Sequence, residues 1–243
     1  MWYWVLLFLF IGIGHSHAQS QDSTIQSPKQ LRADNRQSTS GTRLRMRSIV
    51  VPLALITYGV VAQSTEELRE FDISIKNVVR KDADFHSPVD NYLQYAPALS
   101  VFALNAAGIK GKNNFVDRTF IYLMSNAMMG IIVQTIKRIT KVARPEGFGT
   151  NAFPSGHTAT AFNGAEFLHQ EYKNVSPWYG IVGYAAATTT GILRMYNNKH
   201  WFRDVVGGAG FGILSTQIAY LVYPSIKKLL FKNKPKYSLA LQY

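Results

Sequence analysis

The chain has 243 residues, of which 47% are hydrophobic and 16% charged, and it contains no cysteine. Disulfides and thiolate metal sites are therefore excluded, and the length suits one domain with a sizeable core. The formal net charge of +12 indicates nucleic acid, an anionic membrane surface or a phosphorylated substrate as partner, or basic residues retained on the cytoplasmic side of a membrane. The mean hydropathy of −0.03 is low for a chain made mostly of membrane spans.

The first residues are typical of a secretory signal. An apolar run at 2–14 is followed by the small residues Ser16 and Ala18, and the run is too short for an ordinary span. We expect a signal peptide at 1–18, with an uncleaved anchor as the alternative. Residues 19–48 are rich in Gln, Ser, Thr and Arg, which predicts a flexible basic linker.

Residues 49–91 combine a short apolar segment with an amphipathic one. The apolar part, 49–62, is short for a span, so we expect that it does not cross a membrane. The stretch from Glu66 to Lys81 has apolar residues at helical spacing, which predicts a helix at the membrane interface or one packed on the core. These apolar residues are Leu68, Phe71, Ile75, Val78 and Val79.

Longer apolar segments predict an all-α fold, a helical bundle with several transmembrane helices at 92–223. Four of them approach the roughly 20 residues that a bilayer requires. They lie at about 92–109, 119–136, 177–193 and 205–223. A more polar segment at 155–172 is expected to pack inside the bundle, and residues 224–243 form a basic tail.

The first of three polar clusters follows one of these segments and reads K-x6-R-P. Lys137 and Arg144 share a face if the helix persists until Pro145 ends it. A guanidinium fork and a mobile ammonium are groups that hold phosphate oxygens. A basic loop beside a span is the alternative.

The second cluster is P-S-G-H. Ser155 is placed to cap the start of a helix, where free N–H groups and the helix dipole bind anions. Gly156 allows close approach of an oxygen, and His157 can exchange a proton with a bound anion. An ordinary capped helix is the alternative.

The third cluster contains Arg194, His200 and Asp204 with the spacing R-x5-H-x3-D. A carboxylate one helical turn from a histidine can hold one ring nitrogen and leave the other free as a nucleophile. Residues 196–198 favour a turn that brings Arg194 over the same site. A structural His–Asp pair is the alternative.

Together the three clusters resemble the signature of the type 2 phosphatidic acid phosphatase superfamily, which is K-x6-R-P, P-S-G-H and S-R-x5-H-x3-D. The resemblance covers about residues 90–223 and implies the all-helical phosphatidic acid phosphatase/haloperoxidase-like fold. The chain departs from the pattern at Leu193, where the family usually has a Ser that adds a phosphate contact.

The resemblance also implies a mechanism. His200 would attack phosphorus and form a phosphohistidine, Asp204 would orient it, and His157 would act as general acid and base. No metal or other cofactor is implied. The implied phosphate-binding residues are Lys137, Arg144, Ser155, Gly156 and Arg194.

The implied function is a phosphatase that acts on a lipid phosphate monoester or diphosphate, such as undecaprenyl diphosphate, phosphatidylglycerol phosphate or a lipid A phosphate. Lys110, Lys112, Arg118 and the Lys-rich tail would lie on the cytoplasmic side, so the clusters would face the periplasm from a bacterial-type inner membrane. The expected partners are the phosphorylated lipid and the membrane, without nucleic acid or an obligate protein partner.

Three alternatives stay open. The signal-like start and modest hydropathy favour a soluble periplasmic non-specific acid phosphatase. A vanadate-dependent haloperoxidase has the same kind of pocket, although this chain is short for one. A non-catalytic membrane protein that binds anionic lipid would not require two histidines and an orienting carboxylate.

Overall fold

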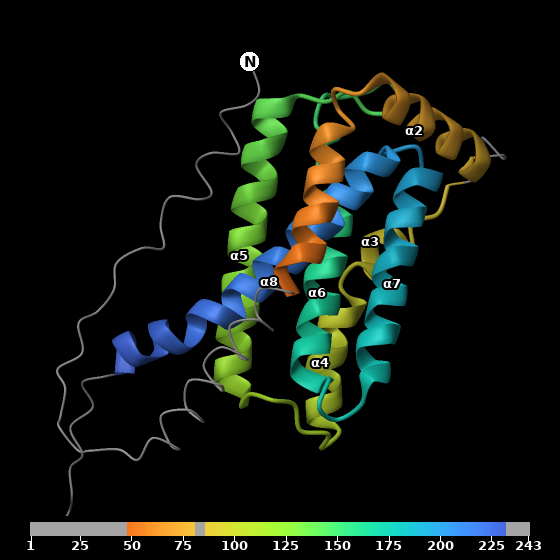
Figure 1. Cartoon of the computed structure of the whole chain (residues 1–243). Helices are drawn as coiled ribbons and strands as arrows, with labels where there is room; N and C mark the ends of the chain where they lie inside the picture. The colour runs from red at the N-terminus through yellow and green to blue at the C-terminus, as the bar shows by residue number, and fades with distance from the viewer. Residues whose placement is uncertain (1–47, 81–85, 232–243) are drawn as a thin grey trace, which may run out of the picture. The chain divides into compact units, whose positions relative to one another are not determined.

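The structure is a computed structural model that describes residues 48–80 and 86–231 (Figure 1). The expected signal peptide, residues 19–47 of the linker and residues 232–243 of the tail lie outside these ranges. Within them every regular element is a helix, so the expected all-α class is confirmed. The helices are Ser48–Val61, α2 (Glu66–Val79), α3 (Asp90–Leu93), α4 (Ala96–Ala106), α5 (Phe115–Thr140), α6 (Gly156–Tyr172), α7 (Pro177–Tyr196) and α8 (Phe202–Phe231).

Helix α6 is the centre of the bundle, because it packs against α4, α5, α7 and α8. Most of its residues are buried, which confirms that the polar segment 155–172 lies inside the bundle. Its contact with α8 is unusually close. A Cβ at Gly212 would lie 2.3 Å from the Ala159 carbonyl oxygen, and one at Gly208 would lie 2.6 Å from the Ser155 carbonyl oxygen. Glycine at both positions therefore lets α8 rest directly on the start of α6.

The described helices include fewer clear membrane spans than the four expected. Only α5 and α8 are long and apolar enough to cross a membrane individually, and helix 48–61 with α2 forms a third candidate that is bent by 98°. The expected segment 92–109 is divided into α3 and the 11-residue α4. Pro97 in the first turn of α4 has no N–H to donate, which suits a helix start and not the interior of a longer span.

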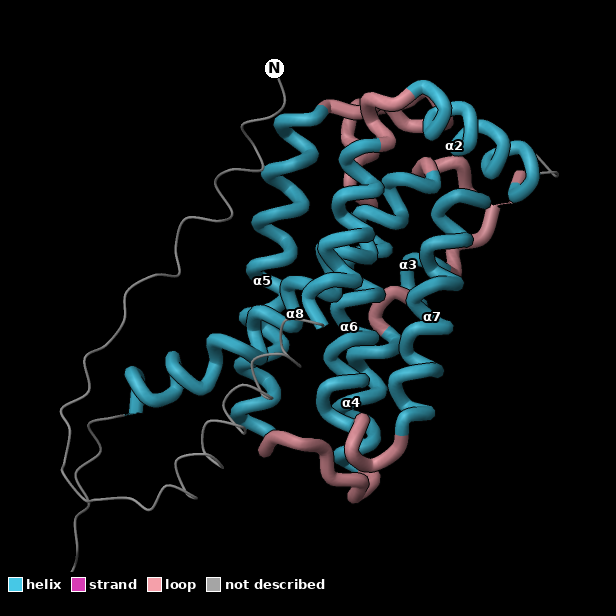
Figure 2. Tube along the Cα trace, viewed as in Figure 1, coloured by secondary structure: helices cyan, strands magenta, loops and turns pink. Residues whose placement is uncertain are grey.

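Helix 48–61 packs along α8. A Cβ at Gly210 would lie 2.7 Å from the Pro52 carbonyl oxygen, and one at Gly59 would lie 2.8 Å from the Gly207 Cα. The segment is thus integrated into the bundle. Whether it crosses a membrane stays a prediction, as does the interfacial position of α2. Helix α2 begins at the expected Glu66 and ends at Val79, while the expected end at Lys81 lies outside the described residues. It crosses the end of the bundle near the α7–α8 loop (Figures 1 and 2).

The successive helices α5 to α8 alternate in direction, so their connections fall at two ends of the bundle (Figure 2). The turn before α5 meets the end of α6 through a hydrogen bond from the Lys112 N–H to the Glu171 carbonyl oxygen. Arg118, which we expected in the connector on the cytoplasmic side, lies at this end on α5 and is buried in an ion pair with Glu171. Helix α8 continues through Pro224 to Phe231, into the segment expected as tail.

Candidate active site

The first cluster differs from the helical arrangement that its spacing predicts. Helix α5 ends at Thr140, and Lys141 after it has a left-handed φ of 46°. Lys137 is therefore on the helix and Arg144 on the following loop. Both side chains nevertheless reach Asn151: the Lys137 Nζ donates to its carbonyl oxygen at 2.5 Å, and the Arg144 Nε donates to its Oδ1 at 2.8 Å.

The loop that carries Arg144 is tied to the loop between α7 and α8. Glu146 accepts a hydrogen bond from Arg144 at 3.4 Å and another from Lys199 at 2.6 Å. Burial acts to raise the pKa of Glu146, but the contacts with Lys199 and Arg144 outweigh it and hold this pKa below its usual value. The first and third clusters are thereby held side by side.

The second cluster forms the predicted helix start. Ser155 is the N-cap of α6 and accepts from the Thr158 N–H at 3.5 Å. The Ser155 N–H donates to the Asp204 carbonyl oxygen at 2.9 Å, which fixes the start of α6 against α8. A Cβ added at Gly156 would meet no atom within 4 Å among the described residues, so the space in front of this helix start is open. An anion of modest size can approach the free N–H groups there.

His157 lies in the first turn of α6, outside the candidate spans. Its Nε2 is 2.9 Å from the Asn91 Oδ1, on α3. Burial lowers the pKa of His157 to about 4, and the nearby Arg194, His200 and Lys137 act in the same direction. His157 is therefore neutral near pH 7 in the free protein.

Arg194 lies in the last turn of α7, and the chain turns immediately after it. Helix α7 ends at Tyr196, and Asn198 has a left-handed φ of 59°, so the turn predicted at 196–198 is present. The buried Arg194 donates from Nη1 to the Asp90 Oδ2 at 2.6 Å. Burial acts to raise the pKa of Asp90, but Arg194 outweighs it and lowers this pKa.

His200 and Asp204 are both buried, and the His200 Nδ1 lies 3.7 Å from the Asp204 Oδ2. This distance is longer than a hydrogen bond, as is common for catalytic pairs without bound substrate. The same oxygen accepts from the Trp201 N–H at 2.9 Å. Burial lowers the pKa of His200, and the charges of Lys137 and Arg194 lower it further, whereas Asp204 acts to raise it. The imidazole is therefore held in its neutral, nucleophilic form.

The three clusters thus gather at one end of the bundle. Their mutual electrostatic effects link Lys137, His157, Arg194 and His200 to one another. Leu193, which replaces the expected Ser, is half-buried in the last turn of α7, and its side chain offers no hydrogen bond to phosphate.

The sequence reasoning missed three residues that contact the clusters. Asp90 and Asn91 on α3 hold Arg194 and His157, and Asn151 receives Lys137 and Arg144. Asp90 and Asn91 were missed because their partners are far away in the chain. Asn151 is 7 and 14 residues from its partners, but no spacing or composition singles it out.

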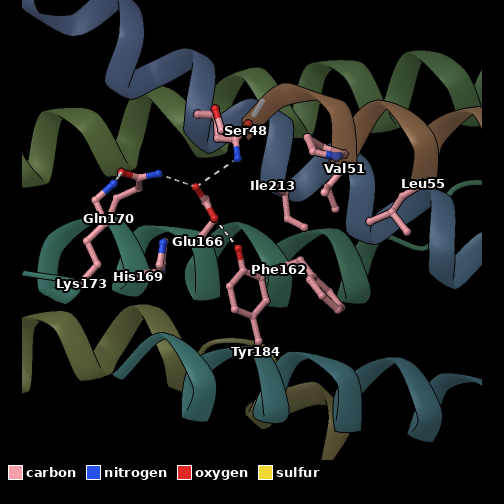
Figure 3. A pocket seen from close by; sticks show the side chains of 12 residues that line it. Ser48, Val51, Leu55, Phe162, Glu166, His169, Gln170, Lys173, Tyr184 and Ile213 are labelled. Carbon is pink, nitrogen blue, oxygen red and sulfur yellow. Dashed lines mark hydrogen bonds between the residues drawn. The ribbon is translucent and has the colours of Figure 1, made fainter. Parts of the chain in front are cut away.

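A cavity of about 470 Å³ lies elsewhere, between helix 48–61 and helices α6, α7 and α8. Figure 3 shows Glu166 near its centre, with Gln170 and Tyr184 directed toward the carboxylate. Its apolar side includes Val51, Leu55 and Phe162. Among the described residues that line it there is no member of the three clusters, so the cavity is distinct from the candidate active site.

Comparison with known proteins places the three clusters in a known class. Residues 118–228, which contain all three clusters, match the PAP2 superfamily. The fold agrees: a solved transmembrane PAP2 type phosphatidylglycerolphosphate phosphatase from Bacillus subtilis superposes with a TM-score of 0.51 at 20% identity, covering 76% of this chain and 99% of that one. The expected fold is therefore confirmed. The match begins at Arg118, so α2, α3 and α4 lie before it.

Curated relatives are more specific. The chain is 37% identical over 158 residues to a lipid A 1-phosphatase of Porphyromonas gingivalis, which covers 65% of this chain and 35% of that protein. It is 28% identical over 148 residues to a lipid A 1-phosphatase of Rhizobium etli, which covers 54% of this chain and 62% of that protein. The chain therefore spans less than two thirds of the length of either relative.

Proposed function

We propose that this chain is a phosphatase that hydrolyses a lipid phosphate monoester or diphosphate. The observation that carries the proposal is the gathering of a buried His200–Asp204 pair, a second histidine and three cationic side chains around an open helix start. The similarity to two lipid A 1-phosphatases makes a lipid A phosphate the first substrate to test. Undecaprenyl diphosphate and phosphatidylglycerol phosphate are the next.

The geometry supports an in-line displacement at phosphorus. Asp204 faces the Nδ1 of His200, so the Nε2 is the atom that attacks. The negative charge of the bound phosphate favours the protonated form of His157, so His157 takes up a proton as the substrate binds. A P–N bond then forms as the P–O bond to the lipid breaks, and the protonated His157 delivers its proton to the leaving oxygen. Water then attacks the phosphohistidine, with His157 accepting the proton, and inorganic phosphate leaves.

The cationic groups and the start of α6 would stabilise the charge that develops on the phosphoryl oxygens. Lys137, Arg144 and Arg194 offer positive charge, while Ser155 and the Gly156 N–H lie at the positive end of the helix dipole. Such fixed donors act most strongly where water is excluded, as around the buried His200. The reaction proposed here requires no metal.

We further propose that the site faces the periplasm from an inner membrane. Lys110 and Lys112 lie in the turn before α5, at the end of the bundle opposite the clusters. Lys227, near the end of α8, lies beside Asp117 at the same opposite end, with the Nζ 2.5 Å from the carboxylate. The positive-inside rule makes that end cytoplasmic even without the buried Arg118.

The test is a phosphate-release assay on the full chain purified in detergent, with EDTA present. The panel contains lipid A phosphate, undecaprenyl diphosphate, phosphatidylglycerol phosphate and the water-soluble p-nitrophenyl phosphate. We expect turnover of a lipid substrate in preference to the soluble one, because α5 and α8 are suited to a membrane. Preference for the soluble ester would favour the non-specific acid phosphatase.

His200→Ala should lower turnover by at least about a thousandfold, because a lost nucleophile has effects of this order. His169→Ala is the matched control, since this second histidine of α6 lines the separate cavity. A folded His200→Ala variant with a near-normal rate would contradict the proposed mechanism, and absence of turnover on the whole panel would contradict the proposed function.

A further inference from the structure

Helix α2 lies before the part of the chain that matches the superfamily, yet one of its acidic residues is almost completely buried. Asp72 is 1% exposed, although Phe71, Ile73 and Val78 on the same helix are largely exposed. Burying a carboxylate is costly unless charge and hydrogen bonds compensate for the lost water. The partners of Asp72 should therefore reveal why it is there.

Within the described residues, the groups that compensate for the burial of Asp72 belong to Arg203. The Asp72 Oδ1 accepts the Arg203 backbone N–H at 3.1 Å, and its Oδ2 is paired with the Arg203 guanidinium. Arg203 is the second residue of α8, and N–H groups in the first turn of a helix have no partner within it. Asp72 therefore caps α8 from another helix. The Arg203 Nε also donates to Gln63 at 2.9 Å, in the turn that precedes α2.

A second residue of α2 reaches both the first and the third cluster. The Lys76 Nζ donates to the Pro145 carbonyl oxygen at 3.1 Å and lies 5.3 Å from the centre of the Trp201 ring. The Arg203 guanidinium is 5.4 Å from the same ring. The Trp201 Nε1 donates to the Ala143 carbonyl oxygen at 3.0 Å. Trp201 is thus held by two cations and tied to the loop that carries Arg144.

We infer that α2 is a positioning element for the catalytic pair, with Asp72 and Lys76 as its positioning residues. His200 and Asp204 are 3.7 Å apart without a direct hydrogen bond, so their approach depends on the backbone between them. That backbone contains Trp201, Phe202 and Arg203, which contact Lys76, Phe71 and Asp72 of α2, respectively. The assignment of these roles to catalysis rests on the proposed function, whereas the hold on the loop can be measured independently.

The decisive variant is Asp72→Asn, which keeps a side-chain oxygen for the Arg203 N–H but removes the charge that pairs with the guanidinium. We expect kcat to fall about ten- to a hundredfold, since small misplacements of reacting groups have effects of this size. KM should change less than about twofold, because Asp72 touches none of the proposed phosphate ligands. In Asp72→Ala, which also removes the cap of α8, kcat should fall further.

The matched control is Asp117→Asn. Asp117 also bonds α8, through Tyr223 at 2.6 Å and Lys227 at 2.5 Å, but at the opposite end of the bundle. The Asp117→Asn variant should be less stable than the wild type but have the same kcat. If Asp72→Asn and Asp117→Asn lower kcat equally after correction for the folded fraction, the effect is general destabilisation and the inference is overturned.

Amide hydrogen exchange gives a measurement that needs no substrate. Amides of residues 200–206 should exchange at least about tenfold faster in Asp72→Asn than in the wild-type chain. In Asp117→Asn the exchange rates of the same amides should be unchanged. Equal exchange in the wild type and Asp72→Asn would overturn the inference even if the enzyme is active. If no substrate is turned over, the proposed function fails, and the exchange rates still decide whether α2 holds the loop.

Discussion

Two buried carboxylates at opposite ends of the bundle differ in how completely they are satisfied. Glu171, at the end of α6, accepts hydrogen bonds from Arg118, Asn113 and Tyr220. Asp204 is equally buried, but one of its oxygens accepts a single backbone N–H and the other has no hydrogen-bond partner within the described residues. Burial alone therefore does not separate a structural carboxylate from a functional one.

The same difference extends to the neighbours of Asp204. The Arg194 Nε and the His200 Nδ1 are also buried without a hydrogen-bond partner in the described part of the chain. Buried polar groups are usually paired, so a cluster of unpaired ones calls for an explanation. We expect that a bound phosphoryl group supplies an acceptor for the Arg194 Nε, and that the His200 Nδ1 closes on Asp204 when the substrate binds. Within the described residues the unpaired atoms are denser at the end of the three clusters, where the Asp90 Oδ1 and the Asn198 Oδ1 also lack a partner, than around Glu171, where the Arg118 Nη1 lacks one. This concentration, more than burial, distinguishes the proposed active site.

The largest effects are expected when either of the two carboxylates, Asp204 or Glu171, is replaced by the corresponding amide. Asp204→Asn should lower kcat by about 10³- to 10⁴-fold, as when a carboxylate that orients a catalytic histidine is lost. Its thermal stability should stay unchanged, because few native bonds are broken. Glu171→Gln should instead lose about 3–5 kcal/mol of stability, since it leaves the buried Arg118 uncompensated. Assays of kcat and denaturant titrations of both variants measure this.

The comparison breaks down if the two variants behave alike. A strongly destabilised Asp204→Asn, or a stable Glu171→Gln with a large loss of kcat in its folded fraction, would show that satisfaction of hydrogen bonds does not distinguish the two ends.

A smaller effect is expected at Asp90, which holds Arg194 from α3. Asp90→Asn removes the charge that fixes the guanidinium at 2.6 Å, so Arg194 is less well aimed at phosphate. We expect kcat/KM to fall about tenfold, which corresponds to roughly 1.4 kcal/mol of transition-state stabilisation. Steady-state kinetics with the preferred lipid measure this. An unchanged kcat/KM would show that α7 alone places Arg194.

The smallest expected effect is on stability as a function of pH. The pKa of His157 is about 4 in the folded chain against 6.5 as its usual value, so the unfolded chain binds more protons between these limits. Stability is therefore full above about pH 6.5 and decreases as the pH falls toward 4. Thermal unfolding at pH 7 and pH 5 should show a smaller decrease for His157→Gln than for the wild type. Equal decreases would mean that His157 is not held neutral by its surroundings.

Local features were predictable from the sequence because their causes are local. The Ser155 cap and the turn at 196–198 depend on residues next to each other, and the amphipathic α2 on spacing over a few turns. The end of α5 was not predictable. Lys141 takes the left-handed conformation that usually falls to glycine or asparagine, so the helix stops before Pro145 without a sequence signal.

Features that depend on distant partners could not be predicted. From the sequence, Arg118 resembles a charge that sets the orientation in the membrane. In the structure it pairs with Glu171, which is 53 residues away in the chain. Asp90 and Asn91 resemble ordinary polar residues at the start of an apolar segment, and only the fold places them against Arg194 and His157. Spacing identified the side chains that carry the proposed chemistry but not those that aim them.

The position of α2 and α3 has a consequence for where this protein can be cut. A truncation that began at Phe115 would retain every residue of the three clusters and the whole superfamily match. It would lose Asp72, Lys76, Asp90 and Asn91, and with them the contacts that orient the third cluster and His157. The shortest stretch recognisable by its sequence is thus smaller than the shortest stretch that could work. A chimera that transfers the recognisable stretch to another protein should therefore include α2 and α3 as well.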